Sequence, residues 1–256
     1  MTCKAFNKNG DRCGAVFGLS WDGYCRWHST EKLCRGKGKD GVQCTAPRKP
    51  DYEYCCAAHD PALYFLSPSL FGRENLRAEK IGVVAEYCGG RDIYHNEKLD
   101  ADKLHEYQID HILEKQCFAF VTVQAGITRK SDQEWVTAFL RDEIANRTKN
   151  LGITRRETNA LKAKACFRFL DDYVTGHRER GDGLTLDTYL KKSQLDGAGG
   201  RLERATTVQI RRAMGKRVKF SQRKLAAEAD TPEFGQISIE LQKMYVDMDL
   251  KVRSMA

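Results

Sequence analysis

The chain has 256 residues, of which 30% are charged, and its formal net charge at neutral pH is +8. It contains no segment with the roughly 18 apolar residues that a membrane-spanning helix requires, and it begins without a basic stretch leading into an apolar run. We therefore expect no membrane partner and an intracellular location, in the nucleus if the host is a eukaryote. The positive charge permits an anionic partner but is too modest to select one.

Cysteines divide the chain into two compositionally different parts. Seven of the ten lie before residue 60, and the other three are spread over the remaining sequence. Within the first part, three cysteines and one histidine occur twice at a constant offset of 31 residues, and each copy reads C-x9-C-x11-C-x2-H. The eight positions are Cys3, Cys13, Cys25, His28, Cys34, Cys44, Cys56 and His59.

The residue types in this repeat predict metal binding. In a reducing compartment, cysteines clustered with histidines are more often metal ligands than disulfides. Three thiolates and one imidazole complete a tetrahedral structural zinc site, so we expect two structural Zn²⁺ ions in residues 1–61. Coincidental cysteine richness and disulfide bonding are the alternatives. Cys55 is an alternative to Cys56 as a ligand, although Tyr24 at the matching place in the first copy favours Cys56.

An Asp-His pair marks the next informative segment. Isoleucines flank Asp110 and His111, and we expect this pair to lie on a strand. Residues 118–123 are rich in β-branched and aromatic side chains, which predicts a further strand.

Two capping-box patterns predict helices further along the chain. Ser131 with Glu134 precedes an apolar helical face. Thr154 with Glu157 precedes a second helix, which we expect to run towards Tyr173 with one buried apolar stripe.

The second of these helices carries a pattern that resembles the HNH, or ββα-metal, nuclease family. The closing pattern of that family, N-L-x7-[HN]-x2-K, is met here by Asn150, Leu151, Asn159 and Lys162, and the Asp-His pair lies upstream. The resemblance covers about residues 105 to 175. The family commonly has a short loop between its Asp-His and its Asn-Leu, whereas 38 residues separate them here, and the excess predicts an inserted helix.

The resemblance implies the roles of individual residues. It makes His111 the general base, and Asp110 with Asn159 the ligands of Mg²⁺ or another divalent cation. It also implies that Asn150 holds the loop that orients the base and that Lys162 neutralises a phosphate. A neutral imidazole can take a proton from water at physiological pH, and carboxylate and amide oxygens suit a hard cation. Neighbouring strand residues point to opposite faces, so the Asp-His pair can share a site only at a strand end or a bulge.

The last third of the chain is basic. Residues 201–224 contain nine basic residues and one acidic residue. Such a run is usually a solvated face, but beside a candidate phosphodiesterase it predicts contact with a nucleic-acid backbone. The predicted contact residues are Arg211, Arg212, Lys216 and Arg217. A glycine-rich stretch at 193–200 predicts a hinge, and residues 237–252 predict a last helix.

Together these patterns predict an α+β chain in three parts. A small zinc-binding repeat module occupies residues 1–61, a mostly helical HNH-like nuclease domain with a ββα-metal core occupies 62–192, and a basic helical region occupies 193–256. The expected function is a metal-dependent endonuclease that hydrolyses phosphodiester bonds in DNA. The alternative is a non-catalytic zinc-binding adaptor for nucleic acid or protein. The choice between DNA and RNA, the sequence specificity and the oligomeric state stay open.

Overall fold

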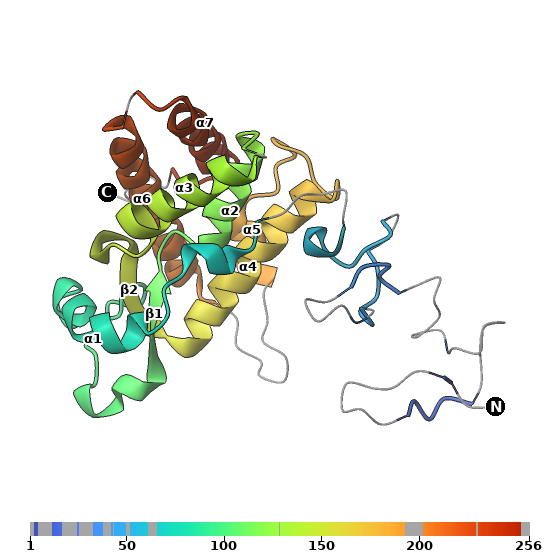
Figure 1. Cartoon of the computed structure of the whole chain (residues 1–256). Coiled ribbons are helices and arrows are strands. Elements are labelled where there is room, and N and C mark those ends of the chain that lie inside the picture. Colours follow the sequence, from blue (N-terminus) through green and yellow to red (C-terminus); the bar gives the residue numbers. More distant parts are fainter. Residues whose placement is uncertain are drawn as a thin grey trace. The chain divides into compact units, whose positions relative to one another are not determined.

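Two units make up the chain in the computed structural model, Met1–Phe65 and Leu66–Ala256 (Figure 1). The structure describes residues 3–4, 12–16, 25, 33–37, 42, 44–49, 52–60, 66–127, 129–192, 202–228 and 230–251. The hinge predicted at 193–200 lies outside them. None of the helices in these ranges is long and apolar enough to cross a membrane.

The first unit repeats one backbone contact at the offset of its sequence repeat. The amide of Cys3 donates to the carbonyl of Ala15, and the amide of Cys34 donates to the carbonyl of Ala46, both at 2.9 Å. Each residue of the second pair lies 31 positions after its counterpart, so the sequence repeat is a structural repeat at these points. The second copy ends in a short 3-10 helix, η1 (Ala57–His59).

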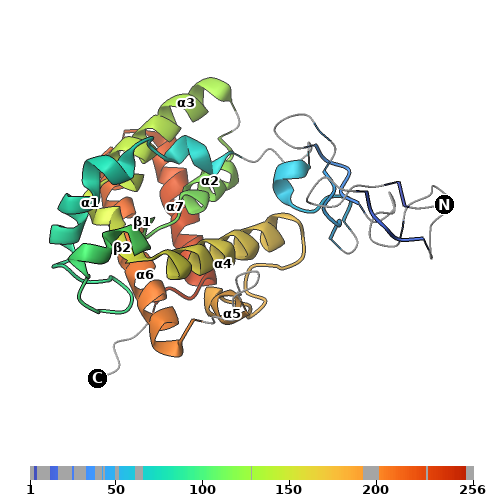
Figure 2. The ribbon, with the colours of Figure 1, turned by 90° about the horizontal axis from the view of Figure 1, so that it is seen from below.

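The second unit is mostly helical and contains a two-stranded sheet (Figure 1, Figure 2). In chain order its elements are η2 (Pro68–Phe71), α1 (Leu76–Tyr87), η3 (Ala101–Glu106), β1 (Tyr107–His111), α2 (Lys115–Gln124), α3 (Lys130–Phe139), the π-helix η4 (Leu140–Ala145), η5 (Thr148–Asn150), β2 (Leu151–Arg155), α4 (Arg156–Val174), α5 (Leu186–Lys192), α6 (Arg204–Ala226) and α7 (Pro232–Asp247). This combination of helices with a small sheet agrees with the predicted α+β class.

The sheet lies between α1 and α4 (Figure 1, Figure 2). β1 and β2 pair antiparallel, with Asp110 opposite Gly152 and His111 opposite Leu151. The predicted position of the Asp-His pair on a strand is therefore confirmed. The helices α2 and α3 and the π-helix η4 separate the two strands along the chain, and α4 follows β2 without a loop.

The helix α2 passes through the main hydrophobic core. Five consecutive residues are at most 3% exposed: Cys117, Phe118, Ala119, Phe120 and Val121. The prediction of a strand at 118–123 is wrong. A helix that is buried on every side is apolar on every side, so its periodicity cannot distinguish it from a buried strand.

The helices expected after the two capping boxes are present, but neither capping box forms. The N-cap residues of α3 and α4 are Arg129 and Arg155, and neither makes a side-chain cap hydrogen bond. Thr154 lies in β2 instead, where its hydroxyl donates to the buried carboxylate of Asp92 at 3.0 Å. The chain passes directly from β2 into α4, which leaves no turn in which a capping box could form.

The C-terminal helices share the core of the helices before them. Ile210 and Met214 from α6 and Leu241 from α7 belong to the same buried cluster as Phe118 in α2. The second unit therefore continues across the boundary predicted at residue 193, and the basic region is not a separate core. The predicted last helix is observed as α7, which begins and ends five residues earlier than predicted.

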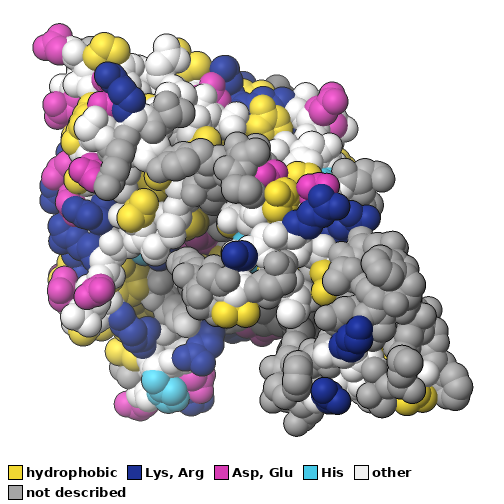
Figure 3. Space-filling model, turned by 45° about the vertical axis from the view of Figure 1, so that its right-hand side comes forward, with side chains coloured by type: hydrophobic (Ala, Val, Ile, Leu, Met, Phe, Trp, Pro, Cys, Tyr) yellow, Lys and Arg dark blue, Asp and Glu magenta, His cyan; other side chains and the backbone are white. Residues whose placement is uncertain are grey.

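Charged side chains of both signs are scattered over the face of the second unit that Figure 3 shows. On the face shown in Figure 3, the described Lys and Arg side chains lie among Asp and Glu side chains and do not form one continuous band. Exposed pairs such as Arg73 with Asp142 at 2.8 Å are part of this mixture. A cationic binding surface on that face must therefore be local.

We expect Gly215→Ala to destabilise the second unit, because α6 comes very close to the chain around the end of α7 at this residue. A Cβ atom at Gly215 would lie 2.6 Å from the carbonyl oxygen of Leu250 and 3.1 Å from the ring of Tyr245. A close-packed interior cannot move this backbone oxygen aside without strain. The free energy of unfolding should fall by roughly 1–3 kcal/mol in urea denaturation.

Gly82→Ala is the matched control for this substitution. Gly82 lies inside α1, and apart from its chain neighbours and the nearby backbone of that helix no atom lies within 4 Å of the place that its Cβ would occupy. Alanine should stabilise that helix by about 0.5–1 kcal/mol. Two substitutions with effects of the same sign and size would contradict the close contact at Gly215.

Candidate functional site

The first unit gathers its cysteines at two points. The thiols of Cys3, Cys13 and Cys25 lie within 4.8 Å of one another, and His28, the predicted fourth ligand, lies outside the described residues. The second group has four members within the same distance: Cys34, Cys44, Cys55 and His59. Both groups could hold a metal ion such as Zn²⁺, because thiolate and imidazole are the ligands that zinc prefers.

In the second group, Cys55 stands where the repeat register predicted Cys56. The Cys55 thiol lies 3.1 Å from His59 Nδ1 and 3.8 Å from the Cys44 thiol. Cys56 does not belong to the group of four. The second copy therefore reads C-x9-C-x10-C-x3-H, one residue out of register with the first. In this arrangement Cys55 replaces Cys56 as the candidate ligand, because its thiol belongs to the group of four whose ligand atoms all lie within 4.8 Å of one another.

We expect Cys55→Ser to remove about one zinc ion per chain and Cys56→Ser to leave the zinc content unchanged. Serine cannot replace a thiolate in a four-ligand zinc site, whereas a thiol outside the site is dispensable. Elemental analysis of the reduced, purified protein should find about two ions in the wild type. A loss of zinc in the Cys56 variant with none in the Cys55 variant would restore the register of the repeat.

The second unit has a cleft of about 540 Å³ along β1. It is lined by residues from the start of α1, from β1, from the start of α2 and from α4: Arg73, Asn75, Leu76, Arg77, Gln108, Ile109, Asp110, His111, Glu114, Lys115, Asn159 and Ala163. Asp110, His111 and Asn159, which the sequence predicted to act together, therefore line one cleft. Asn150 and Lys162 are not among the lining residues.

Lys162 is fully buried and contacts protein oxygens. Its ammonium lies 2.9 Å from Oδ1 of Asp110 and 2.7 Å from Oε1 of Glu114. It also donates to the carbonyls of His111 at 2.9 Å and Ile112 at 3.3 Å. Burial alone would lower the pKa of Lys162, but the two carboxylates raise it well above its usual value. The predicted phosphate contact of Lys162 is wrong, because its side chain is 0% exposed and its charge is matched inside the protein.

The same contacts decide whether Asp110 and Asn159 fit a divalent cation. Asp110 is 1% exposed, its Oδ1 lies beside Lys162, and its Oδ2 accepts a short hydrogen bond from the hydroxyl of Tyr94. Asn159 donates its amide to Oε1 of Gln108 at 2.9 Å. Within the described ranges, the only groups of metal-binding side chains are the two in the first unit. A hard cation needs open carboxylate oxygens, so these residues do not fit Mg²⁺ in this arrangement.

Asn150 holds the turn that follows β1. Its Oδ1 accepts from the amide of Leu113 at 2.9 Å, and its Nδ2 donates to the carbonyls of Leu113 at 3.1 Å and Ala145 at 3.0 Å. Its own carbonyl accepts from the amide of Ile112 at 2.8 Å. The side chain is 0% exposed, so it acts on the backbone and not on a ligand.

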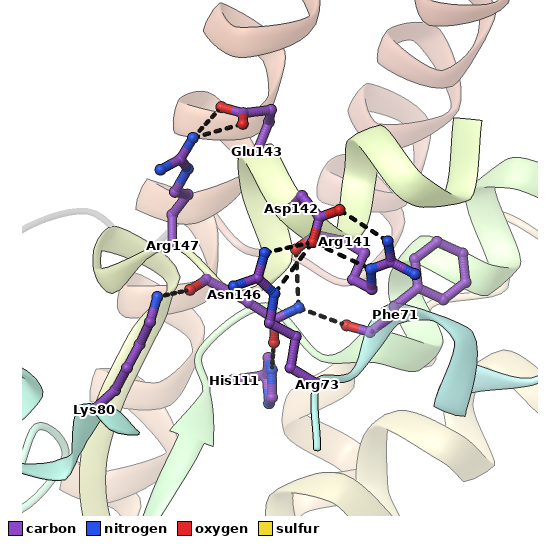
Figure 4. Close-up of polar contacts among 9 residues, drawn as sticks. All are labelled: Phe71, Arg73, Lys80, His111, Arg141, Asp142, Glu143, Asn146 and Arg147. Atoms are coloured by element: carbon purple, nitrogen blue, oxygen red, sulfur yellow. Dashed lines mark hydrogen bonds and ion pairs between the residues drawn. The ribbon is translucent and has the colours of Figure 1, made fainter. Parts of the chain in front are cut away.

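His111 is half-buried at the end of β1, with its ring beside Asn146 (Figure 4). Its Nε2 lies 2.9 Å from Oδ1 of Asn146. Burial lowers the pKa of His111 to about 4; the contact with Asn146 opposes this shift, and the Lys115 ammonium adds to it. The ring is therefore neutral at physiological pH, which is the form that can accept a proton.

The predicted backbone contacts on α6 are only partly available. Arg211 has a side chain that is 12% exposed, and it pairs with Asp249 at 2.8 Å and with Asp187 at 3.6 Å. Its predicted role as a phosphate contact is therefore corrected to an intramolecular one. Arg212 and Arg217 are half-buried, and Lys216 is exposed.

Four residues around His111 escaped every sequence pattern: Asn146, Arg73, Arg77 and Lys115. No local pattern marked the two arginines, because Arg73 lies before the N-cap Asn75 of α1 and Arg77 lies within the helix. Asn146 lies four residues before Asn150 and reads from sequence as an ordinary residue at a helix end. Its position is set by contacts with His111 and Phe71, which lie 35 and 75 residues away in the sequence.

No protein-family model, curated protein or solved structure matches this chain. The chemistry of the cysteine groups and of the cleft is therefore the only guide to what the chain does.

We expect His111 to make the folded state less stable in mild acid. Between about pH 4 and pH 6.5, His111 binds a proton more readily in the unfolded chain than in the folded one. The free energy of unfolding therefore falls as the pH falls through this window. Between about pH 7 and pH 5 the contribution of His111 should be roughly 1–2 kcal/mol. Urea denaturation at both pH values should show a smaller loss in His111→Gln than in wild type. Identical losses would mean that the ring is solvated and titrates normally.

Proposed function

We propose that the cleft along β1 binds a nucleic-acid phosphodiester, most simply that of DNA, and that His111 activates the water that hydrolyses it. In this proposal the chain is an endonuclease whose first unit holds structural zinc. One observation carries it: His111 lines a cleft in which the exposed or half-exposed charges are all positive, namely Arg73, Arg77 and Lys115. The HNH-like order of Asp110, His111, Asn150 and Asn159 supports the same reading.

Two of these cations, Arg77 and Lys115, can face an anion because the acidic residues of the cleft are paired elsewhere, whereas Arg73 pairs with Asp142 at 2.8 Å. Asp110 and Glu114 are buried and contact Lys162. Arg77 donates to the backbone carbonyls of Tyr107 at 2.5 Å and Leu104 at 2.8 Å, so its position is fixed without neutralising its charge. A guanidinium held in this way attracts and orients phosphate oxygens, and the nearby ammonium of Lys115 adds positive charge.

The proposed step needs only groups that the cleft supplies, together with water. The neutral imidazole of His111 takes a proton from water, and the water oxygen bonds to phosphorus. The bond from phosphorus to the 3′ oxygen breaks, and the leaving oxygen takes a proton from solvent. The cations offset the charge that develops on the phosphate oxygens. A bound phosphate also raises the basicity of the ring beside it, because a negative charge favours the imidazolium form.

The test is cleavage of plasmid DNA by the purified full chain, with and without Mg²⁺. His111→Ala should lower the rate by about a hundredfold or more, because a general base typically contributes that much. His105→Ala is the control, since His105 is exposed in η3 and does not line the cleft. Parallel reactions with a single-stranded RNA separate the two nucleic acids. The reaction is run with and without Mg²⁺ because the proposed step uses no metal ion.

Binding is measured beside the rate in the same preparations. Lys115→Gln should weaken DNA binding and flatten its salt dependence by about one phosphate contact, whereas Lys98→Gln, at an exposed lysine that does not line the cleft, should change neither. Wild-type cleavage by the His111→Ala protein, in preparations free of contaminating nuclease, would remove the proposed function. That result would leave the prediction of zinc binding by the first unit standing.

The second candidate is a non-catalytic zinc-binding adaptor. The two cysteine groups favour it, because closed sites of this kind stabilise small modules that bind nucleic acid or protein. A wild-type chain that carries zinc and binds DNA or RNA but cleaves neither would support the adaptor.

A further inference from the structure

Asn146 is the residue whose side chain contacts the His111 ring, and its contacts determine which way its carboxamide faces (Figure 4). The side chain is 1% exposed. Its Nδ2 donates one hydrogen bond to the carbonyl of Phe71 at 3.1 Å and another to the carbonyl of Arg141 at 2.8 Å. An amide nitrogen has two hydrogens, and both are used by these carbonyls. The reversed carboxamide would place its oxygen against these two carbonyl oxygens. None of the three oxygens carries a hydrogen, so no hydrogen bond could form.

This orientation leaves Oδ1 facing His111 Nε2 at 2.9 Å. An amide oxygen accepts and cannot donate, so the hydrogen of the contact must belong to Nε2. In the neutral ring the other nitrogen, Nδ1, then carries no hydrogen. The contact therefore selects one of the two neutral tautomers as well as one ring orientation.

The backbone of Asn146 is held as firmly as its side chain. Its amide donates to the carbonyl of Arg141 at 3.1 Å, five residues earlier, which continues the wide turn of the π-helix η4. Its carbonyl accepts from the ammonium of Lys80 on α1 at 2.8 Å. Single π-helical turns are rare, and those that do occur lie frequently at functional sites. Four elements, η2, η4, α1 and β1, thus meet at one asparagine.

We propose that Asn146 is a positioning residue for His111: it fixes the ring and keeps the proton on Nε2, so that Nδ1 is the nitrogen that receives a proton. The kinetic part of this inference rests on the proposed hydrolysis. The tautomer itself does not, since it is a property of the folded chain without substrate.

The first test reads the tautomer by nuclear magnetic resonance of the full chain with ¹⁵N-labelled histidines. His111→Gln identifies the His111 signals by their loss. Wild-type His111 should show a protonated Nε2 and an unprotonated Nδ1 at neutral pH, and Asn146→Ala should give a mixture of the two tautomers. A wild-type ring protonated at Nδ1, or an unchanged pattern in Asn146→Ala, would overturn the proposal.

The second test measures turnover and binding. Asn146→Ala should lower kcat by about tenfold or more while KM stays near the wild-type value, since a ring in the wrong tautomer cannot act as base. Gly215→Ala is the control for lost stability, because it should destabilise the same unit without touching the ring. Equal losses of kcat in the two variants would reduce Asn146 to a structural role. If the wild type has no nuclease activity, the tautomer measurement alone decides, and if Asn146→Ala does not fold, the wild-type tautomer decides.

Discussion

The buried ammonium of Lys162 requires oxygen partners, and the chain provides them from one short stretch around the end of β1. Asp110, Glu114 and the carbonyls of His111 and Ile112 all reach it. A buried charge left without its partner typically costs roughly 3–5 kcal/mol, so α4 can pack only where these oxygens meet it. The contact thereby fixes the register of α4 against β1. It also explains why two acidic residues at the cleft leave its exposed charge positive.

From this contact the arrangement of the cleft follows residue by residue. With the carbonyl of His111 held by Lys162 and the next turn held by Asn150, the backbone at the end of β1 cannot rotate. Only the side chain of His111 remains to be oriented, and Asn146 contacts it from η4. Lys162, Asn150 and Asn146 are buried, and each is paired with polar partners, which is the condition under which a polar network makes a site rigid. The fold itself therefore holds the His111 ring in place.

Sequence alone predicted the features that depend on local pattern. The strand with Asp110 and the helix with Asn159 were predicted correctly, because the isoleucines beside the Asp-His pair and the helical spacing of apolar residues are local patterns of the sequence. The strand expected at 118–123 was wrong because full burial removes the polar face that distinguishes a helix. The choice between Cys55 and Cys56, the burial of Lys162 and the place of Asn146 depend on contacts between distant segments. No local pattern contains that information, and a motif position such as Lys162 can therefore take a role that its motif does not imply.

The 38 residues between His111 and Asn150 show the same principle in a different form. Compared with the short loop of the family that the motif resembles, these residues look like an insertion that takes no part in the site. Yet Glu114, Lys115 and Asn146 all lie within them: one pairs with Lys162, one adds a positive charge to the cleft, and one contacts the ring of His111. Because loop-closure entropy grows only logarithmically with length, the longer connection costs little. A short loop could not return a helix end to the ring of His111, so in this chain the segment that departs most from the motif supplies the residue that orients its histidine.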